Sequence, residues 1–490
     1  MKSLLIQPAG TREVRKDFVS VQYPINLGYI AAVLKKDGHV IRMMDFNVVE
    51  YDSVRFRKLI LEFEPLVVGF TSMTSTINEF KRLCSEVKGI NEKIITVLGG
   101  VHASALPIQT LEETPDLDII VFGEGEITVC ELYGCIQEKK DFSKIKGISF
   151  REDNRIIKNE ERPLIKNLDD IPKPDRDLLP MEMYAKAHVS RGFSRRELKI
   201  VEIITSRGCP YSCIFCAGHI NYKHKLRFRS YSDITDEIDE CIRKYNTNHV
   251  SIEDDTFTIN RELVTKLCSY FYQKRITWSC NSRVDTVDYP LLKIMSKSGC
   301  KKISFGIESG SPRILKLIKK GITVPQAKKA LRDARKARIR YVEGTFMLGS
   351  HIDETLEDIQ KTEKLIKELM PDFAGLFVMC PFPGTEIFET MKKEKLIEER
   401  PDWNSFTFFG NLRRYEKLNH LTVGQLNQIQ RNFLRKYYSS FGYIFRQILR
   451  IRDLRELRYF CNLGIAFFKE FLFQTNNKIV PRQRNLETRV

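Results

Sequence analysis

The sequence predicts an α/β protein in which two parallel-sheet domains follow one another and a helical region ends the chain. Residues 1–140 alternate short apolar runs with amphipathic helical patterns, residues 196–400 repeat such a step six times, and residues 401–490 have a basic, helical pattern. A chain of 490 residues is too long for one hydrophobic core, so several domains are expected.

The first alternation, residues 1–140, is typical of a doubly wound parallel sheet. Its strands are near-continuous apolar runs, as expected when helices cover both faces of a sheet. Such a sheet binds ligands at the carboxyl ends of its strands. We expect strands at 3–8, 40–46, 66–72, 94–100 and 118–126, and helices at 26–38, 76–90, 107–114 and 127–136.

Residues 141–195 differ in character and are predicted to be a linker. They contain the pattern of a β-hairpin, followed by a segment in which prolines recur too often for one long helix.

The second alternation, residues 196–400, predicts a parallel barrel, full or partial. In such a barrel the loops that follow the strands form the active site. Its strands are expected at 199–208, 249–257, 276–283, 301–309, 339–349 and 372–384, each followed by a helical pattern.

Composition and charge place the chain among ordinary globular proteins. Hydrophobic residues make up 42% and charged residues 29%, which excludes the disordered and collagen-like classes. No N-terminal segment has the pattern of a secretory signal, and no uncharged run approaches the ~20 residues that span a bilayer. We therefore expect a cytoplasmic protein whose twelve cysteines are mostly reduced core residues.

Three cysteines differ from the others because they share one loop. Cys209, Cys213 and Cys216 follow the first strand of the predicted barrel, in the stretch "CPYSCIFC". A zinc site would need a fourth ligand such as His219 or His224, since no second cysteine pair is nearby, and a dithiol redox pair would leave Cys209 without a role. Three thiolates suit a 4Fe-4S cluster in which three irons take one cysteine each and the fourth iron stays open to a substrate.

The loop resembles the Cys-x-x-x-Cys-x-aromatic-Cys motif of the radical S-adenosylmethionine superfamily, whose barrel the surrounding pattern also resembles. The resemblance implies a partial (β/α)6 barrel and a 4Fe-4S cluster whose open iron chelates S-adenosylmethionine. It further implies that an electron from the cluster cleaves the sulfonium to give a 5′-deoxyadenosyl radical. An electron donor such as a ferredoxin or flavodoxin is then an implied partner.

The resemblance also assigns contacts to S-adenosylmethionine, at the ends of successive strands of the barrel. An isolated charge in a loop is more often solvated, but residues at these strand ends converge on one site. The assigned residues are Phe215 at the adenine, Asp254 and Asp255 at the methionine ammonium, Arg283, Glu308 and Ser309 at the ribose and carboxylate, and residues 380–385 behind the adenine.

The N-terminal domain resembles the Rossmann-like cobalamin-binding domain that precedes the radical barrel in one large subgroup, and residues 168–179 resemble the linker of that subgroup. The likeness covers residues 1–400. Glycines at the strand ends allow a large ring to approach the backbone, so the corrin is expected near Gly99, Gly100, Gly123 and Glu124. One feature departs from other cobalamin proteins: their Asp-x-His-x-x-Gly motif is absent, since Phe46 and Asn47 follow Asp45. A cobalamin bound here would therefore take no axial histidine from that motif.

Three functions stay open at this point. The first is cobalamin-dependent methylation of an unactivated carbon, and the second is radical formation of a carbon–carbon bond or ring on a lipid or tetrapyrrole. The third is RNA binding or tRNA modification, suggested by a net charge of +17. Much of that charge is local, because residues 412–490 hold 16 Lys or Arg against 5 Asp or Glu.

The basic tail suggests a contact with a membrane surface. Apolar side chains recur at the spacing of one helix face between 441 and 451, and arginines surround them, which suits an anionic bilayer. The alternative is that this face packs on the barrel. We hypothesise peripheral docking and a lipid or isoprenoid substrate. The apolar residues are Phe441, Phe445, Ile448, Leu449 and Ile451, and the arginines are Arg446, Arg450, Arg452, Arg455 and Arg458.

Overall fold

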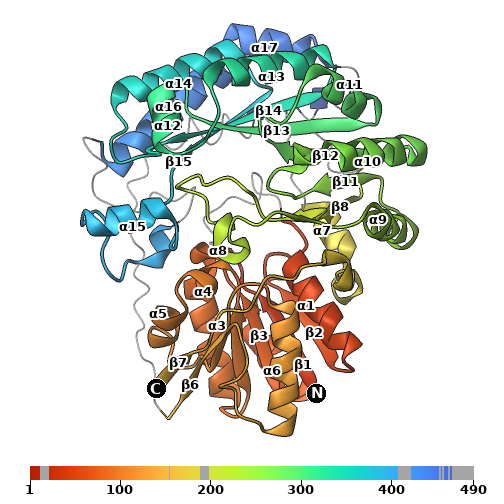
Figure 1. Ribbon diagram of the computed structural model, residues 1–490, viewed down its shortest axis with the longest axis vertical. Helices are drawn as coiled ribbons and strands as arrows, with labels where there is room; N and C mark the ends of the chain where they lie inside the picture. The colour runs from red at the N-terminus through yellow and green to blue at the C-terminus, as the bar shows by residue number, and fades with distance from the viewer. Residues whose placement is uncertain are drawn as a thin grey trace. The chain divides into compact units, whose positions relative to one another are not determined.

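The computed structural model describes most of the chain as two compact units, residues 1–430 and 431–490 (Figure 1). The described residues are 1–10, 21–153, 155–187, 198–406 and 421–451, with positions 454, 457, 458, 460, 461, 464 and 465. The first unit holds a seven-stranded sheet and a six-stranded sheet.

The seven-stranded sheet confirms the predicted doubly wound domain. Its strand order is β2-β1-β3-β4-β5-β6-β7, and the first five strands are parallel. The order reverses between β1 and β3, which places a ligand-binding crevice at the carboxyl edge of the sheet. The strands are β1 (Lys2–Gln7), β2 (Val40–Asp45), β3 (Val67–Thr71), β4 (Ile95–Gly99), β5 (Ile119–Val121), β6 (Ile148–Glu152) and β7 (Arg155–Lys158).

Helices cover this sheet as the apolar pattern requires. Helices α1 (Ile25–Lys36) and α6 (Glu126–Glu138) contact each other, and their apolar side chains join the core formed by the strands. Helix α3 (Ile77–Ile90) contacts α2 (Ser53–Phe63), which our sequence analysis missed. Only a narrow stripe of α2 is buried, formed by Phe56, Ile60 and Phe63, and charged residues alternate with exposed apolar ones at its other positions.

The hairpin predicted within residues 141–195 is present and extends the seven-stranded sheet. Strands β6 and β7 pair antiparallel, and β6 pairs with the short β5. The rest of the segment forms short turns, η2 (Leu168–Asp170) and η3 (Arg176–Leu178), and then α7 (Met181–Ala187). Arg176 is buried and pairs with Glu237 of the barrel at 2.7 Å, so this connection is anchored rather than loose. The domain boundaries themselves stay predictions.

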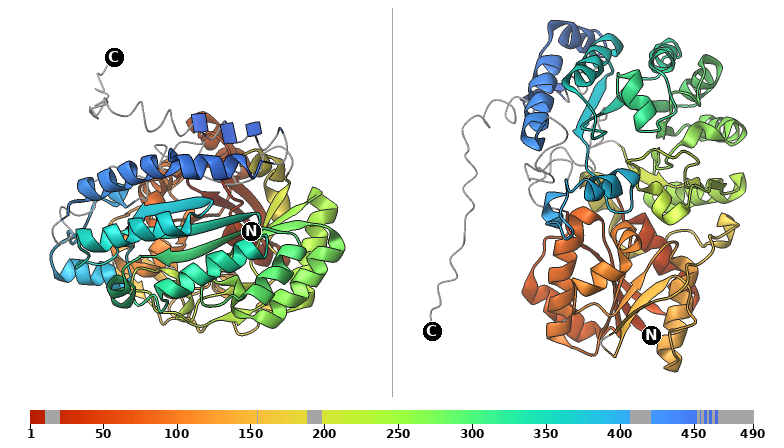
Figure 2. Two further views of the ribbon diagram at one scale, coloured as in Figure 1. Left: turned by 90° about the horizontal axis from the view of Figure 1, so that it is seen from above. Right: turned by 60° about the vertical axis from the view of Figure 1, so that its left-hand side comes forward.

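The six-stranded sheet confirms the second alternation and is an open, all-parallel barrel. Its order is β15-β14-β13-β12-β11-β8, so consecutive strands are neighbours. Its helices lie along the outer side of the curved sheet (Figure 2). The strands are β8 (Ile200–Ile203), β11 (His249–Ile252), β12 (Thr277–Ser282), β13 (Cys300–Glu308), β14 (Tyr341–Leu348) and β15 (Phe373–Val378). The helices are α9 (Tyr231–Tyr245), α10 (Arg261–Lys274), α11 (Tyr289–Lys297), α12 (Pro312–Leu317), α13 (Val324–Lys336), α14 (Leu356–Leu369) and α15 (Glu386–Lys393).

The chain then continues in helices, as predicted. Helix α16 (Val423–Tyr438) is followed by α17 (Phe441–Ile448), and Ser440 caps the start of α17 by accepting a hydrogen bond from the amide of Tyr443. Within the described parts of the chain, no helix combines the length and the apolar character needed to cross a bilayer.

Candidate active site

The three cysteines lie on a loop whose base is closed by a small antiparallel ladder. Strand β9 (Ser206–Arg207) pairs with β10 (Arg227–Phe228), and the short helix α8 (Gly218–Tyr222) lies between them in sequence. Each of the three thiols is free and partly exposed. The loop follows β8, at the carboxyl end of the barrel, as the sequence predicts.

Backbone and side-chain contacts hold the loop against later segments of the barrel domain. Between Cys213 and Cys216, the amide of Ile214 donates to the Ile318 carbonyl at 3.2 Å, and its carbonyl accepts from the amide of Ile387 at 3.1 Å. The guanidinium of Arg283 lies 3.5 Å from the ring centroid of Tyr211. Three later segments of the chain therefore contact the loop.

The two nearby histidines brace the loop and do not complete a zinc site. The ring nitrogens of His219 lie 2.8 Å from the Cys216 carbonyl and 3.1 Å from the Gly384 carbonyl, so both nitrogens face backbone oxygens and not the sulfurs. His224 stacks on His219 with ring centroids 4.9 Å apart. Among the residues that the structure describes, no three His, Cys, Asp or Glu side chains converge on a single metal ion. A cubane cluster needs no such convergence, because each cysteine binds its own iron.

The environment of the thiols fits a bound cluster. Burial raises the pKa of Cys213, and it raises the pKa of Cys216 to about 11, so these groups are neutral thiols until a metal displaces the proton. The cations Lys320 and Arg283 oppose the rise at Cys213 and favour its thiolate. The amide of Gly218 lies 3.4 Å from the Cys216 sulfur and donates to it.

The two aspartates at the end of β11 have different surroundings. Asp254 is buried, and its carboxylate accepts from the Thr205 amide at 2.7 Å, the Thr205 hydroxyl at 2.5 Å and the Ser206 hydroxyl at 2.6 Å. Asp255 instead lies open to solvent beside the cysteine loop: a Cβ added at Gly218 would lie 3.4 Å from its Oδ2 and 3.5 Å from the Cys216 sulfur. Of the two, only Asp255 has a carboxylate available to a ligand.

The residues predicted at the ends of β12 and β13 contact one another through Lys320. The guanidinium of Arg283 donates to Asp285 and to the Lys320 carbonyl, and Glu308 pairs with the Lys320 ammonium at 2.8 Å. That ammonium also lies 6.0 Å from the ring centroid of Phe215. Sequence reasoning missed Lys320, because it belongs to a lysine-rich stretch that reads as a solvated turn. Only the fold brings it to the cysteine loop.

Backbone geometry at Glu308 is strained. Its φ is +70°, and the Ser309 amide donates to the Ile307 carbonyl across it at 2.9 Å, the pattern of a γ-turn. Ser309 is fully buried and its hydroxyl contacts that of Thr362 at 3.2 Å. Ser309 therefore supports the turn. Backbone strain of the kind seen at Glu308 is often found at functional sites.

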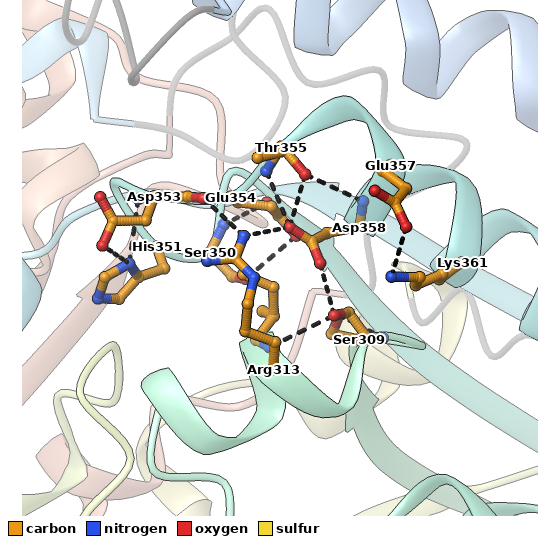
Figure 3. A network of polar contacts seen from close by, with 12 residues as sticks. Ser309, Arg313, Ser350, His351, Asp353, Glu354, Thr355, Glu357, Asp358 and Lys361 are labelled. Atoms are coloured by element: carbon orange, nitrogen blue, oxygen red, sulfur yellow. Dashed lines mark hydrogen bonds and ion pairs between the residues drawn. The ribbon is translucent and has the colours of Figure 1, made fainter.

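A polar network joins the loops after β13 and β14 (Figure 3). Its centre is Asp358, which accepts from Ser311 and Thr355 and pairs with Arg313, and these hydrogen bonds outweigh burial and lower its pKa. Beside it, Glu354 is buried and accepts from the Ser350 amide at 2.9 Å. Burial raises the pKa of Glu354 to about 7.

The carboxyl edge of the seven-stranded sheet is built to accept a large ligand. Gly100 has a φ of +101°, and a Cβ there would lie 2.5 Å from the Ser72 carbonyl, so only glycine fits. Gly99 sits beside it, and a Cβ at Gly123 would meet no atom within 4 Å. Met73, on the neighbouring loop, is 54% exposed. This open, partly apolar edge fits a corrin.

Glu124 and His102 lie at the same edge but face protein groups. The Glu124 carboxylate is buried between Arg207 and Arg227, at 3.0 and 2.7 Å. Burial lowers the pKa of His102 to about 3, and its ring packs on Trp403 with centroids 4.9 Å apart. His102 is thus a neutral core residue and does not replace the missing axial histidine.

The carboxyl edge of the seven-stranded sheet and the cysteine loop are in direct contact. Helix α4 (Val101–Ala105), which follows Gly100, contacts α8 of the cysteine loop. A Cβ at Gly384 would lie 3.0 Å from Ile220 and 3.2 Å from Ala105, so the loop after β15 packs closely at the same place.

Comparison with family models gives two matches. The B12 binding domain model matches residues 13–133, and the radical SAM superfamily model matches residues 203–366. The first range covers strands β2 to β5 of the seven-stranded sheet, and the second covers β11 to β14 of the six-stranded sheet.

Curated relatives match over nearly the whole chain. An uncharacterized methyltransferase of Pyrococcus horikoshii is 32% identical, over 93% of this chain and 95% of the relative. A cytidylyl-2-hydroxyethylphosphonate methyltransferase of Streptomyces wedmorensis is 27% identical, over 83% and 84%. An anaerobic magnesium-protoporphyrin IX monomethyl ester cyclase of Rubrivivax gelatinosus is 25% identical, over 96% and 82%. A hopanoid C-3 methylase of Methylococcus capsulatus is 23% identical, over 88% and 86%.

A solved structure shares the fold. The cobalamin-dependent S-adenosylmethionine radical enzyme OxsB, with aqua-cobalamin and S-adenosylmethionine bound, superposes with a TM-score of 0.71 at 18% identity, over 96% of this chain and 72% of that one. Together the comparisons support the radical methyltransferase interpretation over ring formation and nucleic-acid binding. The chain belongs to the radical S-adenosylmethionine enzymes that carry an N-terminal B12-binding domain.

Proposed function

We propose that the protein methylates an unactivated carbon of a small molecule, using S-adenosylmethionine, a 4Fe-4S cluster and cobalamin. The observation that carries this proposal is the contact between α4, at the corrin edge, and α8, in the cysteine loop. Methyl transfer to a radical needs the corrin and the cluster to face one substrate. The contact between α4 and α8 brings the two proposed cofactor sites together and so meets that requirement.

Each residue of the cysteine loop and its surroundings has a separate role in this proposal. Cys209, Cys213 and Cys216 hold the cluster, and Asp255 binds the ammonium of S-adenosylmethionine because its carboxylate is open beside the loop. Lys320 faces the carboxylate of the same ligand. When bound, the cluster supplies the electron that cleaves the sulfonium, and the corrin supplies the methyl group.

The other predicted contacts act as supports in this proposal. Arg283 fixes Tyr211 and the Lys320 backbone, Glu308 orients the Lys320 ammonium, and Asp254 holds the strand that leads to the loop. Phe215 would lie beside the adenine, as the resemblance implies, and its ring centroid is 6.0 Å from the Lys320 ammonium.

Methyl-labelled S-adenosylmethionine tests this function. Anaerobically reconstituted protein with a reductant is incubated with aqueous and lipid extracts, and products are searched for a gained CD3 group. We expect one labelled compound together with 5′-deoxyadenosine. A product that has lost two hydrogens and carries no label would instead indicate ring formation.

We further propose that the substrate is a lipid or isoprenoid, met at an anionic membrane surface through α17. Phe441, Ile444, Phe445, Ile448 and Leu449 recur at the spacing of one helix face and are all exposed, with Phe441 81% and Leu449 70% accessible. Tyr443 and Gln447, on the opposite face, are buried. An outward apolar face of this kind is typical of an interaction surface.

Charge favours an anionic bilayer as the partner of this face. Residues 431–465 hold eight Lys or Arg against two Asp or Glu. Arg446 and Arg450 flank the apolar face, while Arg452 and Arg455 lie outside the described residues. Cations beside exposed aromatic side chains suit the headgroup region, where each contributes about 1 kcal/mol of attraction.

Vesicle cosedimentation tests the docking surface. We expect the protein to bind phosphatidylglycerol vesicles more strongly than phosphatidylcholine vesicles, and salt to weaken that binding. Replacing both Phe441 and Phe445 by Glu should reduce binding at least about tenfold, because two aromatic side chains no longer enter the interface. Tyr272→Glu, at an exposed aromatic on α10, serves as the matched control. Equal, negligible binding to both vesicles would overturn the proposal.

A further inference from the structure

The base of the cysteine loop places two arginines side by side. In the β9–β10 ladder, Arg207 pairs in register with Arg227. Arg207 lies one residue before Gly208 and two before Cys209. The two ends of the loop approach so closely that a Cβ at Gly208, whose φ is +90°, would clash with the Lys225 carbonyl. Like charges directly opposite in a ladder repel, so the closure needs a counter-charge.

The counter-charge comes from the B12-binding domain. The two oxygens of Glu124 pair with Arg207 at 3.0 Å and Arg227 at 2.7 Å, and Glu126 pairs with Arg207 at 2.6 Å. The side chains of Glu124, Glu126 and Arg207 are all less than 9% exposed. The amide of Ile165, in the connection between the domains, donates to Glu124 at 2.9 Å.

Glu124 also belongs to the corrin edge, because it follows Gly123 directly after β5. A corrin bound at Gly123 would restrict the movement of the backbone at the next residue, Glu124. The same carboxylate fixes both strands that close the cysteine loop. One buried side chain therefore connects the two cofactor sites.

We propose that Glu124 is a positioning residue that couples corrin binding to S-adenosylmethionine binding at the cluster. This inference rests on the proposed function, since it requires both ligands. Because coupling free energies are reciprocal, S-adenosylmethionine tightens corrin binding and the corrin tightens S-adenosylmethionine binding by the same factor. In this proposal Glu124 acts through its ion pairs with Arg207 and Arg227.

Titration of full-length, cluster-reconstituted protein with hydroxocobalamin, with and without S-adenosylmethionine, measures this coupling. We expect S-adenosylmethionine to lower the corrin Kd of the wild-type protein about fivefold or more. Glu124→Gln keeps the shape of the side chain but leaves the two arginines without the negative charge that they share. The ratio of the corrin Kd without S-adenosylmethionine to the Kd with it should therefore fall to about one. The electron paramagnetic resonance signal of the reduced cluster should also change in this variant, without any turnover.

Two further variants separate positioning from general stability. Glu124→Gln combined with Arg227→Gln removes one repelling cation and should recover part of the coupling. Glu131→Gln, on helix α6, removes an ion pair with Arg162 at a 46% exposed carboxylate and should leave the coupling unchanged. Wild-type protein that binds no corrin overturns both the proposed function and this inference. Wild-type coupling that persists in Glu124→Gln overturns the inference alone.

Discussion

The carboxylate of Asp254 accepts hydrogen bonds from the backbone amide and the hydroxyl of Thr205, at 2.7 and 2.5 Å. These bonds connect the end of β11 to the start of the cysteine loop. Asp255, the next residue, is left open beside Cys216. Two adjacent carboxylates thus differ in their surroundings: one holds the loop, and the other is exposed beside it.

Asp255→Asn should weaken S-adenosylmethionine binding. Loss of one hydrogen bond to a charged group costs about 1.5–3 kcal/mol, so the Kd should rise at least about tenfold. Isothermal titration of the anaerobic protein measures it. Asp254→Asn is the matched comparison: it should lower the melting temperature and the iron content instead. Equal effects of the two substitutions on the Kd would contradict the assignment.

Replacing Cys209, Cys213 or Cys216 by Ala should abolish cluster binding and the formation of 5′-deoxyadenosine, because each thiolate holds a separate iron. Iron and sulfide content and product analysis check this. Cys461→Ala removes an exposed thiol and should change neither quantity. A triple Ala variant that still produced 5′-deoxyadenosine would rule out the radical mechanism.

Gly123→Leu should block corrin binding while the domain stays folded. The new side chain occupies open space above the sheet edge, although the φ of +78° adds roughly 1–2 kcal/mol of strain. Absorbance titration with hydroxocobalamin measures the loss. Gly134→Leu, on α6, also enters open space and should bind corrin normally. Unchanged affinity in Gly123→Leu would place the corrin elsewhere.

The free energy of unfolding should fall as the pH rises from the pKa of Glu354 in the unfolded chain to its pKa in the folded protein. Burial raises the pKa of this carboxyl to about 7, so the folded protein holds a proton that the unfolded chain releases from about pH 4.5. The free energy of unfolding therefore decreases by about 3 kcal/mol between these pH values and is level above them.

Thermal melts of Glu354→Gln at about pH 5 and about pH 8 check this contribution. The substitution should reduce the pH dependence, because the amide does not titrate. Glu357→Gln, at an exposed carboxylate paired with Lys361, should keep the wild-type dependence. A Glu354→Gln variant with the full wild-type slope would show that other carboxyls are responsible.

Much of the fold could be predicted from sequence because its signals are local. The near-continuous apolar strands and amphipathic helices required a doubly wound sheet and an open barrel, and both are present. Helix α2 was missed because its buried stripe is narrow, and β5 is shorter than its apolar run because the chain turns after Val121 into the loop that carries Glu124.

The sequence by itself determined the cysteine loop, its place after the first barrel strand and the glycines at the strand ends of the first sheet, because spacing and backbone freedom are local properties. The tertiary structure alone decided the partners of charged groups. It buried Asp254 and left Asp255 open, brought Lys320 to the cysteine loop, and placed Glu124 between Arg207 and Arg227. Burial and pairing depend on segments that are far apart in the chain, so no motif encodes them.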